Sequence, residues 1–437
     1  MSITSASQAM LDRYEAVRET LPGQQIAWLA DLREAAVRSF GETGLPTPKV
    51  EEWKYTNLRA LDGFDFSEPP GDAGAAVDLP DAIGAGPRLV FVDGVFRDDL
   101  SRLGDFDGVR FTPLADRLEG GADLIQPRLG DLGQDQPLLA LNGAFLEDGY
   151  VAEVAEKAEI AQPLEIVFAD TGGDIPTARQ PRNMIIAGAG SRVQIIETHL
   201  GAAPSQQFFN GATMITVAEG ASVEHRRVQR QGTGSVHVNT VRARIDNGGI
   251  YDSFVLQQGA AVARDEVQVG LTAGGSVARL NGVYLGDGSQ VLDNTTVVRH
   301  ATENSTSEQL YKGALTGSAR AVFQGNIRVE AGADGTDGRM TNKTLLLSDK
   351  AEIDTKPQLE ILADDVKCSH GATAGELDGD ALFYLRARGI PEAQARGMLV
   401  EAFLGEVIDG VEEEPIEPLL RDAVGNWLAH AQETEEV

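Results

Sequence analysis

Turns followed by short strands recur at a nearly fixed spacing between residues 150 and 375, and this spacing constrains the fold more than any other feature. Runs of alternating apolar and polar residues are separated there by glycine, asparagine, aspartate and serine. Stacked coils of similar length would keep such a spacing, because each coil buries its inward residues against its neighbours. The glycines step by 30, 29, 26, 13 and 29 residues through Gly190, Gly220, Gly249, Gly275, Gly288 and Gly317.

The repeat predicts a β-helix, and a β-sandwich is the alternative. The strict hexapeptide repeat of left-handed β-helices is missing from the sequence. We therefore expect a mainly β protein with a right-handed parallel β-helix core, beginning at about residue 150, that is flanked by α-helical regions at both ends.

The flanking regions show helical rather than strand periodicity. Apolar residues recur at helical spacing twice between residues 5 and 40, and a stretch rich in Ala, Gly, Pro and Asp at 68–86 has the composition of a linker. Residues 88–96 predict a hairpin, and three helices are expected after Asp378, the last over about 416–429. The expected regions are 1–85, 86–375 and 376–437.

The charge excludes several classes of partner. The chain carries 37 Lys and Arg against 67 Asp and Glu, a formal net charge of −30. Such a chain repels nucleic acid and anionic membrane surfaces. The sequence has no basic segment followed by an apolar stretch at its start, so we expect a cytoplasmic protein without membrane spans.

The single cysteine, Cys368, lies two positions before His370. In an extended strand the two side chains share a face and could reach one metal ion. One thiol cannot complete a site that needs several thiolates, so a metal held here requires donors from a second chain or a substrate. The alternative is that Cys368 is a small buried apolar residue and His370 an ordinary turn residue.

Common catalytic motifs are missing from the sequence. It contains no P-loop for ATP, and no H-E-x-x-H, Cys-x-x-Cys or G-x-S-x-G. We expect a chain that is not an enzyme by itself, although a β-helix polysaccharide-active enzyme with convergent carboxylates stays open. Each isolated histidine on the strands, namely His199, His225, His237 and His300, is expected to be an ordinary polar residue rather than a ligand.

Several long motifs resemble the SufB/SufD family of iron-sulfur cluster assembly proteins. The C-terminal signature of that family is similar to this sequence around Cys368 and His370, and the resemblance covers most of the chain. Where the SufB type continues with Glu-Ala after the shared Cys-x-His, this chain has Gly371 and Ala372, which favours the SufD type over a SufB-type scaffold that carries a cluster alone. The matching segments are 51–56, 351–361, 366–373, 375–378, 381–390 and 402–407.

The resemblance implies a function and partners. SufD-type members have a right-handed parallel β-helix, pair with SufB through it, and dock the ABC-type ATPase SufC through C-terminal helices. It implies that His370, with Cys368 beside it, helps hold a nascent iron-sulfur cluster that is shared with SufB and then passed to apo-proteins. ATP would be bound by SufC, and a homodimer of this chain alone stays open as an alternative.

The expected ATPase-docking surface lies on the C-terminal helices. An apolar stripe there could instead cap the open end of a β-helix. The residues expected to dock the ATPase are Leu382, Phe383, Leu385, Arg388, Met398, Leu399 and Phe403.

Overall fold

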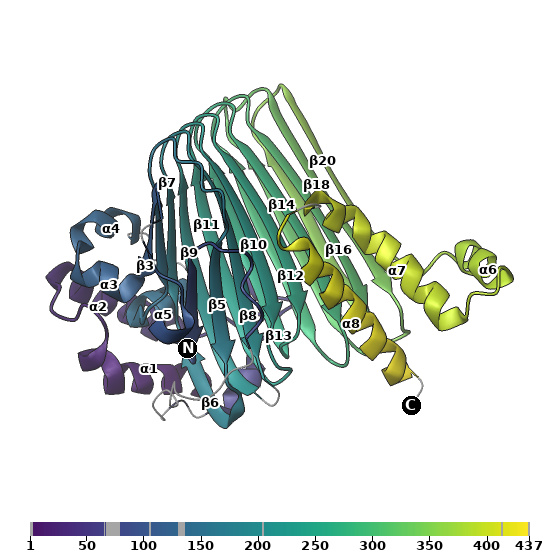
Figure 1. The fold of residues 1–437 in the computed structure, drawn as a ribbon, viewed down its shortest axis with the longest axis horizontal. Coiled ribbons are helices and arrows are strands. Elements are labelled where there is room, and N and C mark those ends of the chain that lie inside the picture. Colours follow the sequence, from purple (N-terminus) through teal and green to yellow (C-terminus); the bar gives the residue numbers. More distant parts are fainter. Residues whose placement is uncertain are drawn as a thin grey trace.

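Two long parallel sheets stacked face to face dominate the computed structural model of the chain (Figure 1). The structure describes residues 3–64, 66, 79–104, 106–129, 136–202, 205–411 and 414–435. From residue 182 onward, consecutive strands alternate between the sheets, so each coil of chain adds one strand to each of them. The predicted fold class, a parallel β-helix flanked by helices, is confirmed, and the alternative β-sandwich is wrong.

Sheet A and sheet B each follow a simple spatial order. Sheet A contains β2 (Val95–Phe96), β1 (Arg88–Val92), β5 (Leu164–Asp170), β8 (Arg192–Gly201), β10 (Ser222–Arg230), β12 (Ile250–Gln258), β14 (Val277–Gly286), β16 (Thr306–Leu315), β18 (Thr336–Leu346) and β20 (Val366–Gly375). Sheet B contains β19 (Glu352–Ile361), β17 (Arg320–Val329), β15 (Val291–His300), β13 (Val262–Leu271), β11 (Val236–Ile245), β9 (Ser205–Val217), β7 (Arg182–Ala187), β4 (Tyr150–Val154) and β3 (Val109–Pro113), with β6 (Gly173–Arg179) paired to β9.

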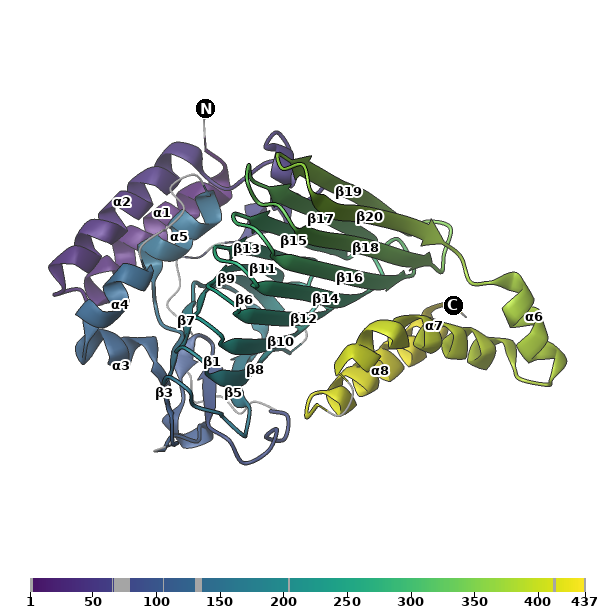
Figure 2. The same cartoon turned by 90° about the horizontal axis from the view of Figure 1, so that it is seen from above.

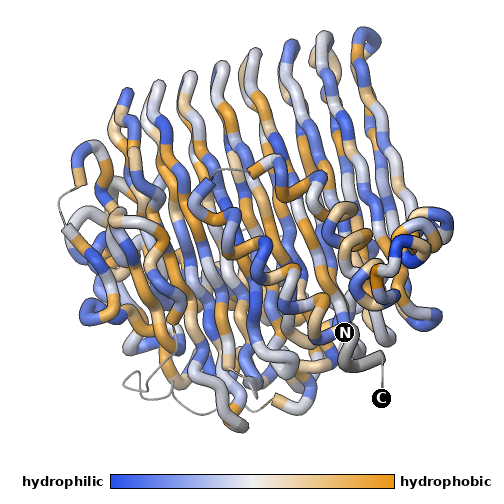
Figure 3. The backbone as a smooth tube through the Cα atoms, turned by 45° about the vertical axis from the view of Figure 1, so that its right-hand side comes forward, coloured by the Kyte–Doolittle hydropathy of each residue, from blue (hydrophilic) through white to orange (hydrophobic). Residues whose placement is uncertain are grey.

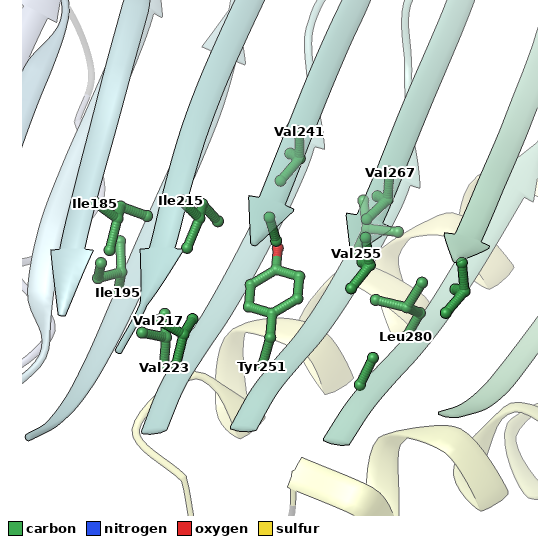
Figure 4. Close-up of a cluster of buried hydrophobic side chains, with 14 of the residues drawn as sticks. Ile185, Ile195, Ile215, Val217, Val223, Val241, Tyr251, Val255, Val267 and Leu280 are labelled. Atoms are coloured by element: carbon green, nitrogen blue, oxygen red, sulfur yellow. The ribbon is translucent and has the colours of Figure 1, made fainter. Parts of the chain in front are cut away.

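The core lies between the two sheets. Every second residue of a strand points inward, and the parallel register places like residues above one another, as Val193 and Val223 do. Figure 4 shows pairs of inward side chains from the two sheets: Ile195 of sheet A lies beside Ile185 of sheet B, and Val223 of sheet A lies beside Val217 of sheet B. The same alternation appears along the whole solenoid as changing colour on each strand in Figure 3.

Glycines close the turns that lead from sheet B to sheet A. Gly190, Gly220, Gly248 and Gly275 all have a positive φ, between 62° and 69°, which favours glycine. Each N–H donates to a carbonyl of the next turn in the stack, as from Gly220 to Asn247 at 2.9 Å. The third glycine of this stack is Gly248, one residue before the Gly249 in the sequence-derived series.

The short step of 13 residues in that series has a geometric cause. Gly288 and Gly317 lie in the opposite stack of turns, which leads from sheet A to sheet B, and the Ser318 N–H donates to the Gly288 carbonyl at 2.6 Å. One coil contains both kinds of turn. The series therefore passes from one stack to the other between Gly275 and Gly288.

The N-terminal region covers the outer face of sheet B. Its helices are α1 (Ser5–Val17), α2 (Ala27–Thr43), α3 (Leu114–Glu119), α4 (Ala122–Leu129) and α5 (Pro137–Phe145). Apolar residues of α1, α2 and α5 share a buried cluster with residues of β9, β11 and β13, including Phe208 and Val238. The helices between 114 and 145 were not expected within the predicted β-rich region 86–375.

Two further predictions concern this region. The two helices predicted between residues 5 and 40 correspond to α1 and α2, and the predicted hairpin corresponds to β1 and β2, which pair antiparallel. Most of the predicted linker at 68–86 lies outside the described residues. Short 3-10 turns occur at η1 (Arg18–Thr20), η2 (Glu51–Trp53), η3 (Arg59–Gly63), η4 (Asp98–Leu100) and η5 (Asp409–Val411).

The C-terminal arm consists of α6 (Gly379–Ala387), α7 (Glu392–Ile408) and α8 (Glu417–Glu435). Its last two helices lie over the outer face of sheet A, and α6 projects beyond the sheets (Figures 1 and 2). Apolar residues of α7 and α8, among them Leu404 and Trp427, bury themselves against Phe254 and Val283. No helix within the described residues is long and apolar enough to cross a membrane.

Candidate functional site

Cys368 and His370 lie on β20, the last strand of sheet A. Within the described residues β20 pairs with β18 alone, so its other edge offers unpaired backbone groups. The register places Cys368 opposite Gly338 and His370 opposite Met340. Both partners are buried residues of the inner face, so alternation directs Cys368 and His370 to the open end of the solenoid interior.

The two side chains differ in exposure. Cys368 is half-buried and packs against the main core, with its sulfur next to Gly338. Burial raises the pKa of the Cys368 thiol, and the nearby Asp337 carboxylate adds to this rise. The thiol therefore stays protonated at neutral pH unless a cation approaches it. His370 is exposed, so its imidazole is the more accessible ligand of the pair.

The end of the solenoid is open. The strands from β7 to β18 bury most of their residues, whereas the residues of β19 and β20 are all partly or fully exposed. Ile361 at the end of β19 and Leu362 directly after it are both exposed, the latter to 67%. Across the described part of the chain, no group of three or more His, Cys, Asp and Glu residues is placed to hold a metal ion. Cys368 and His370 therefore offer two donors to a metal ion, fewer than the four ligands of a typical zinc or iron-sulfur iron site.

The predicted docking residues fall into two groups. Helices α6 and α7 are joined by residues 388–391, and we call this joint with the exposed residues of both helices the elbow. Within it, Phe383 on α6 is 73% exposed and Met398 on α7 is 42% exposed. Phe403 instead lies against sheet A, where the Lys312 ammonium is 4.4 Å from the centre of its ring. The partly or fully exposed residues of the elbow are Leu382, Phe383, Leu385, Arg388, Met398 and Leu399.

Sequence reasoning missed one exposed member of the elbow. Tyr384 is 56% exposed, and the Arg388 guanidinium lies 4.4 Å from its ring centre. A cleft of about 960 Å³ separates the elbow from the last coil and is lined by Leu346, Leu377 and Leu382, among others. The apolar stripe in the sequence could not identify Tyr384 as exposed, because the exposure of this residue depends on which side of α6 faces the solenoid.

The segment 51–56 anchors the N-terminal region to sheet B. The Arg264 guanidinium lies 4.2 Å from the Trp53 ring centre, and Thr56 donates to Asp293 at 2.5 Å. Lys356 on β19 reaches Glu51 at 2.5 Å. This motif therefore connects the helices of the N-terminal region to the last strand of sheet B.

A buried ionisable cluster was also missed. The Glu197 carboxylate contacts His199 Nε2 at 3.3 Å and His225 Nε2 at 3.0 Å, and Tyr150 donates to it. Burial alone would raise the pKa of Glu197, but the two histidines outweigh it and hold that pKa well below its usual value. Burial also lowers the pKa of His225. The shared face of Glu197 and His199 was the one available signal in the sequence, and His225 joins them only through the register of β8 and β10.

The chain is similar to known proteins over most of its length. The family model described as SUF system FeS cluster assembly, SufBD core domain, matches residues 168–403, and the SufBD protein N-terminal region matches residues 4–166. The chain is 31% identical over 423 residues to an iron-sulfur cluster assembly SufBD family protein of Synechocystis sp., covering 92% of each chain. It is 33% identical over 394 residues to iron-sulfur cluster assembly protein SufD of Escherichia coli, covering 88% of this chain and 90% of that protein.

Proposed function

The chain belongs to the SufBD family of iron-sulfur cluster assembly proteins, and from this premise we propose that it is a SufD-type scaffold subunit. It pairs with a SufB-like protein through the open end of its β-helix. It docks a SufC-like ABC-type ATPase through the elbow of α6 and α7, and the complex builds a nascent cluster for apo-proteins.

The observation that carries this proposal is the open end at β19 and β20. Both strands end their sheets, so their outer edges can accept strands of a second β-helix, as exposed sheet edges do in β-augmentation. The thiol and imidazole of Cys368 and His370 lie at the same end. A partner that continues the sheets would bring its own ligands next to these two side chains.

The roles of the two side chains differ. His370 is exposed and supplies an imidazole nitrogen to iron, which is a ligand that iron accepts in place of thiolate. Cys368 packs on the core with a raised thiol pKa, so it contributes a sulfur only when iron stabilises its thiolate. The cluster is cargo that is shared with the partner, and most of its thiolates come from the SufB-like chain.

ATP chemistry belongs to the partner in this proposal. The chain has no P-loop sequence, and its elbow presents apolar and cationic groups in Phe383, Met398 and Arg388. Exposed apolar residues next to a cleft are suited to receive another protein surface. The chain itself acts as a scaffold without catalysis.

Anaerobic coexpression with the SufB-like and SufC-like proteins tests the proposal. We expect a three-protein complex whose bound iron and sulfide fall about ten-fold in a His370→Ala variant, because an iron ligand is lost. Ser369→Ala, on the same strand but the opposite face, is the matched control and should keep the full amount.

Two outcomes would contradict the proposal. Full cluster content in a His370→Ala complex that assembles normally would remove His370 from the site. Failure of the wild-type chain to copurify with either partner would reject the scaffold role itself.

A further inference from the structure

The C-terminal arm is held to the solenoid along only part of its length. The residues of α7 that are buried lie mainly in its second half, from Val400 to Ile408, and α8 buries Leu420 and Trp427. None of the residues of α6 is buried. Figure 2 shows α6 and the start of α7 beyond the sheets, while α8 runs beneath them. The arm thus has a fixed part and an overhanging part.

The fixed part is secured by a buried guanidinium. Arg226 on β10 donates to both oxygens of Glu414, which precedes α8, at 2.8 and 2.7 Å, and Gln194 donates to the same carboxylate at 2.9 Å. Arg226 is 2% exposed and also reaches Asp252 at 2.7 Å. Bidentate contacts of this kind are strong and directional. This end of the arm is therefore firmly attached to sheet A.

A second ionic contact lies within the fixed part of α7. Lys312 on β16, whose side chain is 2% exposed, donates to the Phe403 carbonyl at 2.6 Å and to the Glu406 carboxylate. Lys343 on β18 also reaches Glu406, at 3.5 Å, and its side chain is 37% exposed. One carboxylate of α7 therefore bridges two adjacent strands of sheet A, with the longer and more exposed contact nearer the end of the solenoid.

Strand register connects this bridge to β20. Lys312 is paired with Lys343, and Lys343 is paired with Thr373 on β20. The same pair of strands places Met340 opposite His370. The outer face of β18 thus carries the contact with α7, and its next strand carries Cys368 and His370.

We propose that Glu406 is a positioning residue that couples the elbow of α6 and α7 to the last strands of the solenoid. This inference rests on the proposed function, in which the ATPase docks at the elbow. Movement of the overhanging part turns α7 about Lys312, which keeps its bond to the Phe403 carbonyl. The contact between Lys343 and Glu406 is released first, and β18 and β20 then loosen together.

Hydrogen exchange of the three-protein complex tests this coupling. Deuterium uptake of residues 366–375 is compared between the nucleotide-free and ATP-bound complexes for the wild type, Glu406→Gln and Lys343→Gln. We expect ATP to change the uptake in the wild type and both variants to lose most of that change while still binding the ATPase. Glu401→Gln, an exposed position on α7, is the control and should behave as the wild type.

The outcomes separate a coupling role from a purely structural one. A variant that unfolds at a lower temperature but keeps the wild-type change in uptake would overturn the coupling and leave the scaffold role standing. An uptake of residues 366–375 in the wild type that ATP does not alter would also overturn the coupling. Loss of ATPase binding by the wild type would overturn the coupling together with the proposed function.

Discussion

At the scale of single residues, the interior of the solenoid contains an ion pair that sequence reasoning could not find. Arg227 on β10 donates to Asp265 on β13 at 2.5 Å, and the two residues are 2% and 4% exposed. They are far apart in the sequence and belong to different sheets, so only the coil register brings them together. Ser253 and Asn239 complete the polar surroundings of the pair.

Removing one member of this pair leaves the other charge buried. We expect Asp265→Asn to lower the free energy of unfolding by about 3 to 5 kcal/mol, because a buried guanidinium without its carboxylate is strongly unfavourable. Urea unfolding of the isolated chain measures the change. Glu330→Gln, which breaks the exposed pair with Arg299, should cost less than about 1 kcal/mol, and an equal cost for both variants would contradict this reasoning.

A second residue predicts a pH dependence. Burial raises the pKa of Asp148 to about 7, and its carboxyl accepts the Ala115 N–H at 3.0 Å. The pKa in the unfolded chain is about 3.9. Because the folded pKa is the higher one, the stability that this group contributes is complete below about pH 4 and is lost as the pH rises to about 7.

Asp148→Asn removes this titration and keeps an oxygen for the Ala115 N–H. As the pH rises from 5.5 to 8, we expect the free energy of unfolding of the variant to increase by about 1 to 2 kcal/mol relative to that of the wild type. Unfolding in urea at both pH values measures the difference. Asp107→Asn, at an exposed position, serves as the control and should show no such gain. If the free energies of unfolding of the wild type and of Asp148→Asn change equally between the two pH values, the raised pKa of Asp148 is disproved.

At the scale of elements, the glycine series predicted the solenoid but not its two stacks of turns. The spacing of about 29 residues reports the length of one coil, so the fold class followed from the sequence. The short step needed the structure, because glycine spacing does not say which sheet the next strand joins. The contact of Phe403 with sheet A could likewise not be predicted from the sequence. An apolar residue on a helix packs against whichever surface the path of the chain brings next to it.

One turn replaces glycine by asparagine. Asn304 has a φ of 57° and continues the stack of Gly275, whose N–H donates to its carbonyl at 2.9 Å. Asparagine tolerates this left-handed conformation better than other residues with a Cβ. The series of glycines identified in the sequence therefore does not include this turn, because its left-handed residue is an asparagine.

The turn predicts the order of stability of two substitutions. Asn304→Ala should lower the free energy of unfolding by about 1 kcal/mol, because alanine is strained at this φ, whereas Asn304→Gly should stay within about 0.5 kcal/mol of the wild type. Thermal or urea unfolding distinguishes them. Glu303→Ala, at the preceding exposed position, controls for the loss of a polar side chain. An alanine variant as stable as the glycine variant would argue against the left-handed turn.

At the scale of the whole molecule, the two ends of the solenoid differ in the kind of strand pairing that ends each sheet. At the N-terminal end, β2 and β3 close the sheets with antiparallel pairs, whereas β19 and β20 end them at the other side with parallel edges exposed. The sequence predicted a shared site from the single cysteine, and the structure places Cys368 and His370 at that exposed end. The position of the end could not be predicted, because it depends on where the last coil stops.

This asymmetry predicts how a single surface charge affects pairing. Leu362, 67% exposed at the open end, should contact a second β-helix that extends the sheets, so Leu362→Lys places a charge in an apolar interface. We expect the affinity for the SufB-like partner to fall about ten-fold or more, measured by sedimentation, with no change in the unfolding of the isolated chain. Ile175→Lys, at an apolar residue 57% exposed on β6, is the matched control. If Ile175→Lys weakens pairing and Leu362→Lys does not, the partner binds elsewhere on the solenoid, because Leu362 directly follows β19 at the open end, whereas Ile175 lies on β6, which pairs with β9.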